Sequence, residues 1–263
     1  MNFIISASTN VGTTKSINED SAIIRRLMTP GGEAVLAAVC DGVGGLSSGE
    51  IASASVVCAL GRWFLEVFPA LYMQGMTERN LFQSWFELVQ HLNTSIGEYG
   101  QHKNMHLGTT LSAFLIVDNV CYIMNVGDSR VYEITEEVRL LTHDQTLVAE
   151  EVERGIISPE EAASDPRRNI ILQCIGESEE VFPEFRTEMA KTEAVYMACS
   201  DGFRHVVTDE EIRNALGPDN RTEEMLQEGL EYLIHLNMSR HETDNISAVA
   251  ARTYIAYEGC CDG

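Results

Sequence analysis

Residues 34–40 have the sequence AVLAAVC and run directly into Asp41-Gly42, and this stretch decides how the chain folds. Seven consecutive apolar residues without polar alternation are typical of a β-strand that is buried on both faces. The pattern returns at residues 194–199, which are also apolar and run into Ser200-Asp201-Gly202. Each run therefore places a carboxylate at the point where a buried strand ends.

Hydrophobic periodicity and turn signals predict the remaining elements. Strands are predicted at residues 3–9, 21–27, 34–40, 109–117, 120–126, 129–135, 138–141, 194–199 and 245–251, and helices at about residues 49–68, 78–99, 209–216 and 222–238. This order lacks the regular strand–helix alternation of a parallel sheet, so we predict an α+β fold with antiparallel sheets covered by helices. No repeat or Pro/Ser-rich linker interrupts the sequence, so we expect one domain over residues 1–263.

Composition excludes several classes of function. The chain has 18 basic and 40 acidic side chains, which gives a formal net charge of −22. Such a surface repels nucleic acid and anionic membrane, so a nuclease is disfavoured. An acidic solvated surface is one explanation of the charge, and a set of carboxylates that holds cations is the other. The spacing of the carboxylates has to decide between them.

Cysteine usage indicates a reducing compartment. Seven cysteines are present, five of them scattered singly, and the adjacent pair Cys260-Cys261 has no second pair to complete a zinc site. The odd count and the lack of a signal-peptide pattern predict a cytoplasmic protein. We also find no apolar run of the ~20 residues that span a bilayer, so no membrane partner is expected.

Five acidic motifs share one structural context, the end of a predicted strand. They are Asn18-Glu19-Asp20, Asp41-Gly42-Val43-Gly44-Gly45, Gly127-Asp128-Ser129-Arg130, Ser200-Asp201-Gly202 and Asp244-Asn245. Strand ends are rigid and can aim several side chains at one point, and hard divalent cations require oxygen ligands. Asp-Gly is also a common turn dipeptide, and for any single motif a turn is the better explanation. Five motifs in order favour a metal site.

In order, spacing and local structure these motifs resemble the PPM or type 2C Ser/Thr protein phosphatases in their compact bacterial form, over nearly the whole chain. The resemblance also covers Lys15-Ser16-Ile17, Gly49-Glu50-Ile51-Ala52-Ser53, Gly108-Thr109-Thr110, Leu141-Thr142-His143-Asp144-Gln145 and Pro166-Arg167-Arg168-Asn169. It implies a four-layer αββα sandwich, in which two antiparallel sheets face each other between helices and the metals lie at one edge.

The resemblance also implies the ligands of two Mg²⁺ or Mn²⁺ ions. Asp41 would bridge the two ions, and Asp201 and Asp244 would complete the first site. The carbonyl of Gly42 would help to form the second site, with Glu19 acting directly or through water. Two such ions can share a bridging water and lower its pKa, so the expected reaction is attack of this water on phosphorus, without a phosphoenzyme.

Three further positions receive roles from the same resemblance. Asp20 would orient the metal-binding residues or water through hydrogen bonds, without binding a metal ion itself. Asp128 would contribute to a third, weaker metal site, as in bacterial relatives. Lys15 stands where the family has an arginine that holds the substrate phosphate, and lysine lacks the planar two-point fork of arginine. We therefore count Lys15 with Asp41 among the catalytic residues and expect weaker phosphate orientation, while a solvated surface lysine remains the alternative.

Two other positions depart from the family. His205 stands where many relatives have an aspartate that helps the third metal; it could ligate Mn²⁺ as a neutral imidazole or be an ordinary surface histidine. Val43 stands where some relatives have a histidine proposed as the general acid. The leaving group would then take its proton from water or from another residue. His143 and His106 are the alternatives, and their spacing in the sequence favours neither of them.

The expected substrates are proteins that a cognate kinase has phosphorylated on serine or threonine, and the phosphatase itself is expected to be a monomer. A flap at about residues 142–176, which is polar and poor in apolar runs, is predicted to be mobile. The resemblance implies that this flap lies near the active site and tunes substrate choice. The alternative function is a catalytically weakened regulatory or scaffold module that keeps the fold. A phosphatase for small phosphoesters is a third possibility, which no apolar pocket motif in the sequence supports.

Overall fold

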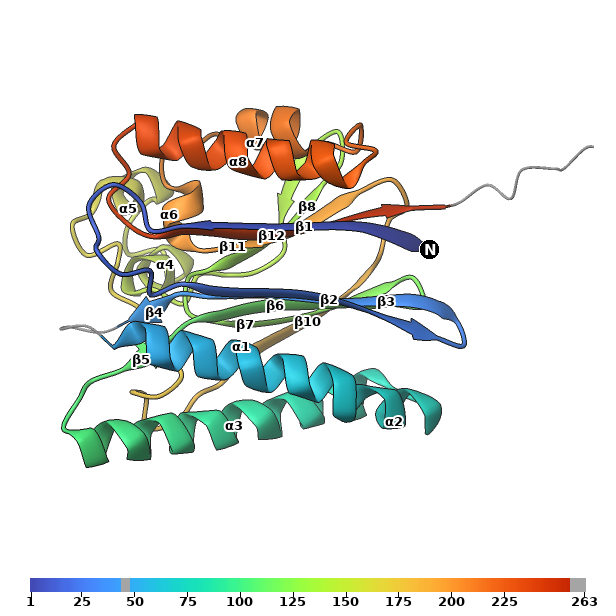
Figure 1. The fold of residues 1–263 in the computed structure, drawn as a ribbon. Coiled ribbons are helices and arrows are strands. Elements are labelled where there is room, and N and C mark those ends of the chain that lie inside the picture. The colour runs from blue at the N-terminus through green and yellow to red at the C-terminus, as the bar shows by residue number, and fades with distance from the viewer. Residues whose placement is uncertain (44–47, 256–263) are drawn as a thin grey trace, which may run out of the picture.

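Two five-stranded antiparallel sheets lie face to face between helices in the computed structural model, which describes residues 1–43 and 48–255 (Figure 1). The first sheet has the order β1 (Asn2–Asn10), β12 (Ile246–Tyr254), β11 (Val195–Cys199), β8 (Arg130–Ile134) and β9 (Val138–Leu140). The second has the order β10 (Glu184–Met189), β7 (Val120–Val126), β6 (Leu111–Val117), β3 (Gly32–Cys40) and β2 (Ser21–Thr29). The predicted αββα sandwich is thereby confirmed.

Helices cover the outer face of each sheet. The second sheet is covered by α1 (Gly49–Glu66), α2 (Phe68–Met73) and α3 (Glu78–Lys103), and the first by α6 (Asp201–Arg204), α7 (Asp209–Leu216) and α8 (Glu223–Ser239). The short pair β4 (Gly42–Val43) and β5 (Gly108–Thr109) lies at one end of the sandwich, together with α4 (Leu147–Glu153) and α5 (Pro159–Ser164) (Figure 1).

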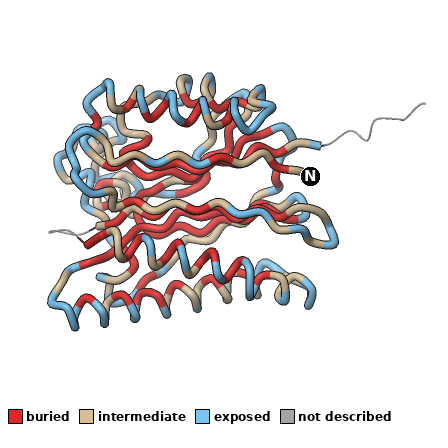
Figure 2. The backbone as a smooth tube through the Cα atoms, viewed as in Figure 1, coloured by how far each residue is buried: buried red, intermediate tan, exposed pale blue. Residues whose placement is uncertain are grey.

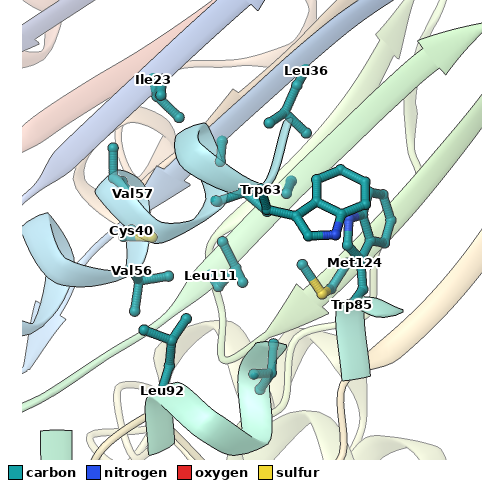
Figure 3. Close-up of a cluster of buried hydrophobic side chains, with 14 of the residues drawn as sticks. Ile23, Leu36, Cys40, Val56, Val57, Trp63, Trp85, Leu92, Leu111 and Met124 are labelled. Atoms are coloured by element: carbon teal, nitrogen blue, oxygen red, sulfur yellow. The ribbon is translucent and has the colours of Figure 1, made fainter. Parts of the chain in front are cut away.

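Strand β3 is buried on both faces, as its apolar sequence predicts. Leu36 and Cys40 belong to the core that faces α1 and α3, where Trp63 and Trp85 also lie and Cys40 is near Val56 and Val57 (Figure 3). Val35, Ala37 and Val39 point the other way, into the core between the two sheets. The buried strands of both sheets form the red layers of Figure 2. Since β3 is held from both sides, Asp41 at its end has a fixed position.

Strand β10 and the length of α3 differ from the prediction. Residues 184–189 read EFRTEM and were not predicted as a strand, yet they pair with β7 along the edge of the second sheet. Their side chains are only partly buried, so the segment lacks the apolar pattern on which the prediction depends. Helix α3 runs to Lys103, where Asn104 ends it in the left-handed conformation. Gly44, Gly45, Cys260 and Cys261 lie outside the described residues.

One segment in the described ranges, Gly49–Met73, is long and apolar enough to cross a membrane by length and composition. It consists of α1 and α2, whose buried side chains pack on the second sheet and on α3. The core of a layered protein explains this composition. The segment is interrupted by Glu50, Arg62 and Glu66, so it is not an unbroken apolar run, and the expectation of no membrane partner stays a prediction.

Candidate active site

Close backbone contacts bring the acidic motifs together at the β4–β5 end of the sandwich. A Cβ on Gly42 would lie 2.5 Å from the carbonyl oxygen of Glu19, and a Cβ on Gly202 would lie 2.2 Å from that of Asn245. Distances below 3.0 Å are not tolerated between such atoms, so only glycine allows these approaches. The glycine after each aspartate thus lets two chain segments touch, which draws Asp41 toward Glu19 and Asp201 toward Asp244.

The backbone of Asp41 is fixed by hydrogen bonds to Thr109, the last residue of β5, and to Thr110, which follows it. The Asp41 N–H donates to Oγ1 of Thr110, and the Asp41 carbonyl accepts from the Thr110 N–H and the Thr109 hydroxyl, all at 2.9 Å. Burial, followed by the charges of Asp20, Asp201, Asp128 and Asp244 in that order, raises the pKa of the Asp41 carboxyl well above its usual range. These carboxylates are therefore close enough to repel one another.

Asp20 and Asp128 are two of the buried members of this group, which we call the carboxylate site (Glu19, Asp20, Asp41, Asp128, Asp201 and Asp244). Burial raises the pKa of each to about 7, and the charge of Asp201 adds to the shift in both cases. The Ser200 hydroxyl donates to Oδ2 of Asp20 at 2.9 Å. The other oxygen, Oδ1, is buried without a hydrogen-bond partner in the described part of the chain.

Glu19 is positioned by two neighbours. The N–H of Gly49, at the first residue of α1, donates to Oε1 of Glu19 at 3.1 Å. The Glu19 N–H donates to the side-chain oxygen of Asn245 at 2.8 Å, and the amide nitrogen of Asn245 donates to the carbonyls of Val11 and Ile17. Asn245 therefore fixes the loop that carries the first motif to the start of β12. The sequence singled out Asn245 only as the neighbour of Asp244.

Lys15 lies against the carboxylate site. Its Nζ is 3.0 Å from Oδ1 of Asp244 and 4.0 Å from Oε2 of Glu19, while the side chain stays 40% exposed. Burial works against the charge of the ammonium, but the hydrogen bond to Asp244 and the charges of Asp244, Glu19 and Asp41 outweigh it and raise the pKa of Lys15. The structure thus brings a cation to the place where the sequence predicted a phosphate-binding residue.

His205 lies between two carboxylates. Its Nε2 is 3.4 Å from Oδ2 of Asp201, and its Nδ1 is 3.4 Å from Oε2 of Glu242. Burial lowers the pKa of His205, but the hydrogen bond to Glu242 and the charge of Asp201 outweigh it, so the pKa is raised. Glu242 also accepts the N–H groups of Thr243 and Asp244. No motif in the sequence marks Glu242, because its role depends on contacts that form only in the fold.

The other two histidines considered as proton donors lie elsewhere. His143 is exposed and pairs with Glu184, with its Nδ1 2.7 Å from Oε1. His106 is also exposed and pairs with Glu177 at 3.3 Å. Neither contacts a member of the carboxylate site through any described hydrogen bond or ion pair, and Val43 pairs with Gly108 in the short β4–β5 ladder.

The carboxylate site fits divalent cations by its chemistry, although its side chains are not closed around one. Among the described residues, no three Asp, Glu, His or Cys side chains are arranged so that they could hold a metal ion. Asp244 is instead paired with Lys15, and Asp201 with His205. Oδ1 of Asp20 and Oδ1 of Asp201 are buried and unpaired within the described ranges. Unpaired, mutually repelling oxygen donors are what Mg²⁺ or Mn²⁺ would satisfy.

A pocket of about 760 Å³, which we call the site pocket, opens beside the carboxylate site. Asp128, Asp244 and Arg204 line its inner side, and Arg168 and Asn169 line it from the flap. Arg204 donates to the carbonyl of Asp128 at 3.3 Å. The flap therefore forms one wall of the space next to the acidic residues.

The flap is built from α4 and α5. Ser158 and Glu161 cap α5 reciprocally, as the sequence Ser-Pro-Glu-Glu predicts. An antiparallel bridge between Thr146 and Ile171 closes the base of the flap. Arg167 binds Glu151 through both of its terminal nitrogens, at 3.0 and 2.8 Å, and so joins the end of the flap to α4.

Comparison with known proteins agrees with this geometry. A family model described as protein phosphatase 2C matches residues 13–233. Protein phosphatase PhpP of Streptococcus pneumoniae is 32% identical over 218 residues, which are 82% of this chain and 85% of that protein. The serine/threonine phosphatase of S. agalactiae superposes with a TM-score of 0.83 at 30% identity, covering 96% of this chain and 100% of the other.

A further solved structure bears on the metal. The catalytic domain of the serine/threonine protein phosphatase PstP, in complex with two manganese ions, has a TM-score of 0.76 at 28% identity and covers 96% of this chain and 99% of the other.

The fold and the carboxylate site define a phosphoric monoester hydrolase of the αββα class. The chain belongs to the protein phosphatase 2C, or PPM, family and is a protein serine/threonine phosphatase. Phosphatases of this family depend on metal ions.

Proposed function

We propose that this chain removes phosphate from phosphoserine and phosphothreonine in proteins, with two Mg²⁺ or Mn²⁺ ions held by Asp41, Asp201, Asp244, Glu19 and the carbonyl of Gly42. The observation that carries the proposal is the close backbone approach at Gly42 and Gly202, which brings the carboxylates of the strand ends together. Burial, followed by the charges of four neighbouring carboxylates, raises the pKa of Asp41 accordingly. Bound divalent ions would stabilise these charges and would supply a nucleophilic water at neutral pH.

The residues around the ions would position the reactants. Lys15, which is 3.0 Å from Asp244, would hold a phosphate oxygen through its ammonium. One carboxylate oxygen of Asp20 accepts a hydrogen bond from the Ser200 hydroxyl, and the other oxygen would orient a metal-binding residue or water. With valine at position 43, the proton for the departing Ser or Thr oxygen would come from solvent in the site pocket.

A third ion at Asp128 is the finer part of the proposal. His205 holds Asp201 and Glu242 in the structure, and the raised pKa of its imidazole disfavours the neutral form that binds metal. We therefore expect the third site to be weaker than the other two.

The proposed setting follows from composition. A net charge of −22 and the free cysteines in the described part of the chain suit a monomer in the cytoplasm that acts on the products of a cognate Ser/Thr kinase.

Hydrolysis of p-nitrophenyl phosphate and of a phosphothreonine peptide, with Mn²⁺ and with EDTA, tests the proposal. We expect Mn²⁺-dependent turnover of both substrates, which Asp41→Asn abolishes and Asp219→Asn, a change at an exposed position, leaves intact. Mn²⁺ binding without any turnover by the unmodified protein would instead support the regulatory or scaffold module.

A further inference from the structure

A second cavity lies beside the site pocket along α4. This cavity, the flap groove, has a volume of about 990 Å³ and extends from Leu140 and Thr142 to Leu172 and Phe182. It shares five lining residues with the site pocket, namely Arg130, Asp144, Thr146, Ala149 and Val152. The two cavities therefore adjoin along α4, so a ligand seated in the site pocket can continue into the flap groove.

The flap groove carries uncompensated negative charge. Arg130 lines it but is bound by Asp144 at 2.8 and 2.7 Å, and His143 is held by Glu184. Glu153, Glu179 and Glu180 also line the groove, and they have no ion-pair partner in the described part of the chain. Three exposed carboxylates on one surface favour a cationic ligand.

The groove also presents exposed apolar side chains. Phe182 is 63% exposed and Leu172 is 48% exposed, and both line the groove. The backbone of Phe182 is held by Gln173, which accepts its N–H and donates to its carbonyl, each at 2.8 Å. A ring on a fixed backbone loses little conformational entropy when a ligand packs against it. This surface suits a large apolar side chain flanked by positive charges.

We propose that the flap groove binds the polypeptide segment next to the phosphorylated residue of the substrate, and that it selects segments with basic side chains beside one large apolar side chain. This inference rests on the proposed phosphatase function, because the groove is assigned to the substrate on the ground that it adjoins the site pocket. The ligand's lysines or arginines pair with Glu153, Glu179 and Glu180, and its apolar side chain packs on Phe182 and Leu172.

The test compares two phosphothreonine peptides of equal length, one with Lys and Leu in the flanking positions and one with Glu and Ser. We expect kcat/KM to be about tenfold higher for the basic, apolar peptide, because several exposed ion pairs and one buried apolar side chain act together. The double variant Glu179→Lys/Glu180→Lys removes this preference, and Phe182→Ala raises KM for the basic peptide alone. Hydrolysis of p-nitrophenyl phosphate, which has no flanking segment, stays unchanged in all variants.

The matched control is Glu66→Lys/Glu228→Lys, which changes the net charge equally at exposed positions on α1 and α8 that line neither cavity. If the control removes the preference as well, or if the unmodified enzyme favours the acidic peptide, the inference is wrong. Binding of the unphosphorylated basic peptide, followed by fluorescence anisotropy, needs no turnover and is expected to weaken only in the groove variants. Failure of p-nitrophenyl phosphate hydrolysis would overturn the proposed function, whereas hydrolysis without peptide discrimination would overturn only this inference.

Discussion

Lys15 has its Nζ 3.0 Å from Oδ1 of Asp244, and this position makes its proposed role in phosphate binding testable. Replacement by arginine is expected to raise kcat/KM for a phosphopeptide about threefold to tenfold, because a planar fork can bind phosphate through two hydrogen bonds. Lys15→Ala is expected to lower kcat/KM by about tenfold to hundredfold, which is the effect of losing one charged hydrogen bond. Steady-state kinetics with Lys103→Ala as a control measure both effects, and an unchanged rate in Lys15→Arg would remove Lys15 from phosphate binding.

The buried carboxylates make the stability of the metal-free protein depend on pH. Asp20 and Asp128 have a pKa of about 7 in the fold, against about 3.9 for an ordinary aspartate. Between these values the folded state binds protons that the unfolded state does not bind. The resulting stability is therefore complete at low pH and is lost as the pH rises through about 7.

In EDTA we consequently expect the Tm to fall between about pH 5.5 and pH 7.5. Saturating Mn²⁺ should reverse this trend, because metal binding requires the ionised carboxylates. Differential scanning calorimetry at both pH values measures the difference. A Tm in EDTA that is higher at the upper pH would contradict the assigned protonation of Asp20 and Asp128.

At the scale of elements, the site depends on how loops are attached to strand ends. Asn245, at the start of β12, satisfies the Glu19 N–H and two carbonyls of the first loop. Asn245→Ala removes the partner of all three partly buried groups and is expected to cost about 2 to 4 kcal/mol of unfolding free energy. We also expect weaker Mn²⁺ binding, because Glu19 loses its anchor.

Chemical denaturation and Mn²⁺ calorimetry check both effects of this substitution. Asn245→Asp keeps the acceptor for the Glu19 N–H, so its stability and Mn²⁺ affinity should lie between those of Asn245→Ala and the unmodified protein. Asn214→Ala, at an exposed position of α7, should change neither quantity. Equal Mn²⁺ affinity in Asn245→Ala and in the unmodified protein would show that Asn245 does not position Glu19.

Buried strands could be predicted from the sequence, whereas one edge strand could not. Strands such as β3 and β11 were predictable because burial on both faces requires an unbroken apolar run. Strand β10 was missed because it lies at a sheet edge, with polar side chains and hydrogen bonds to β7 alone. Its pairing comes from tertiary structure and leaves no periodic signal in six residues.

The same distinction holds for the candidate site. Acidic residues that directly follow apolar runs were predictable, since the strand end fixes where they point. Glu242 and the support of Asp41 by Thr109 and Thr110 were not predictable, because these contacts join residues that are far apart in the sequence. The pairing of Asp244 with Lys15 likewise appears only in the fold.

For the whole molecule, the layered arrangement explains why one end carries the chemistry. Both sheets are held by cores on their inner and outer faces, so the strand ends at β4 and β5 cannot relax apart to separate the carboxylates (Figure 1). The fold thus keeps like charges together at a cost in stability, as is common where a site must bind a cation. We expect the acidic surface and the flap groove to influence which phosphoproteins bind there.

Anomalous X-ray scattering from crystals grown with Mn²⁺ tests this account most directly. The account predicts two strong manganese peaks bridged by Asp41, with Asp201, Asp244 and Glu19 turned toward them and Lys15 displaced from Asp244. Crystals in which Asp201 and Asp244 keep their present partners, with no manganese peak near Asp41, would contradict it.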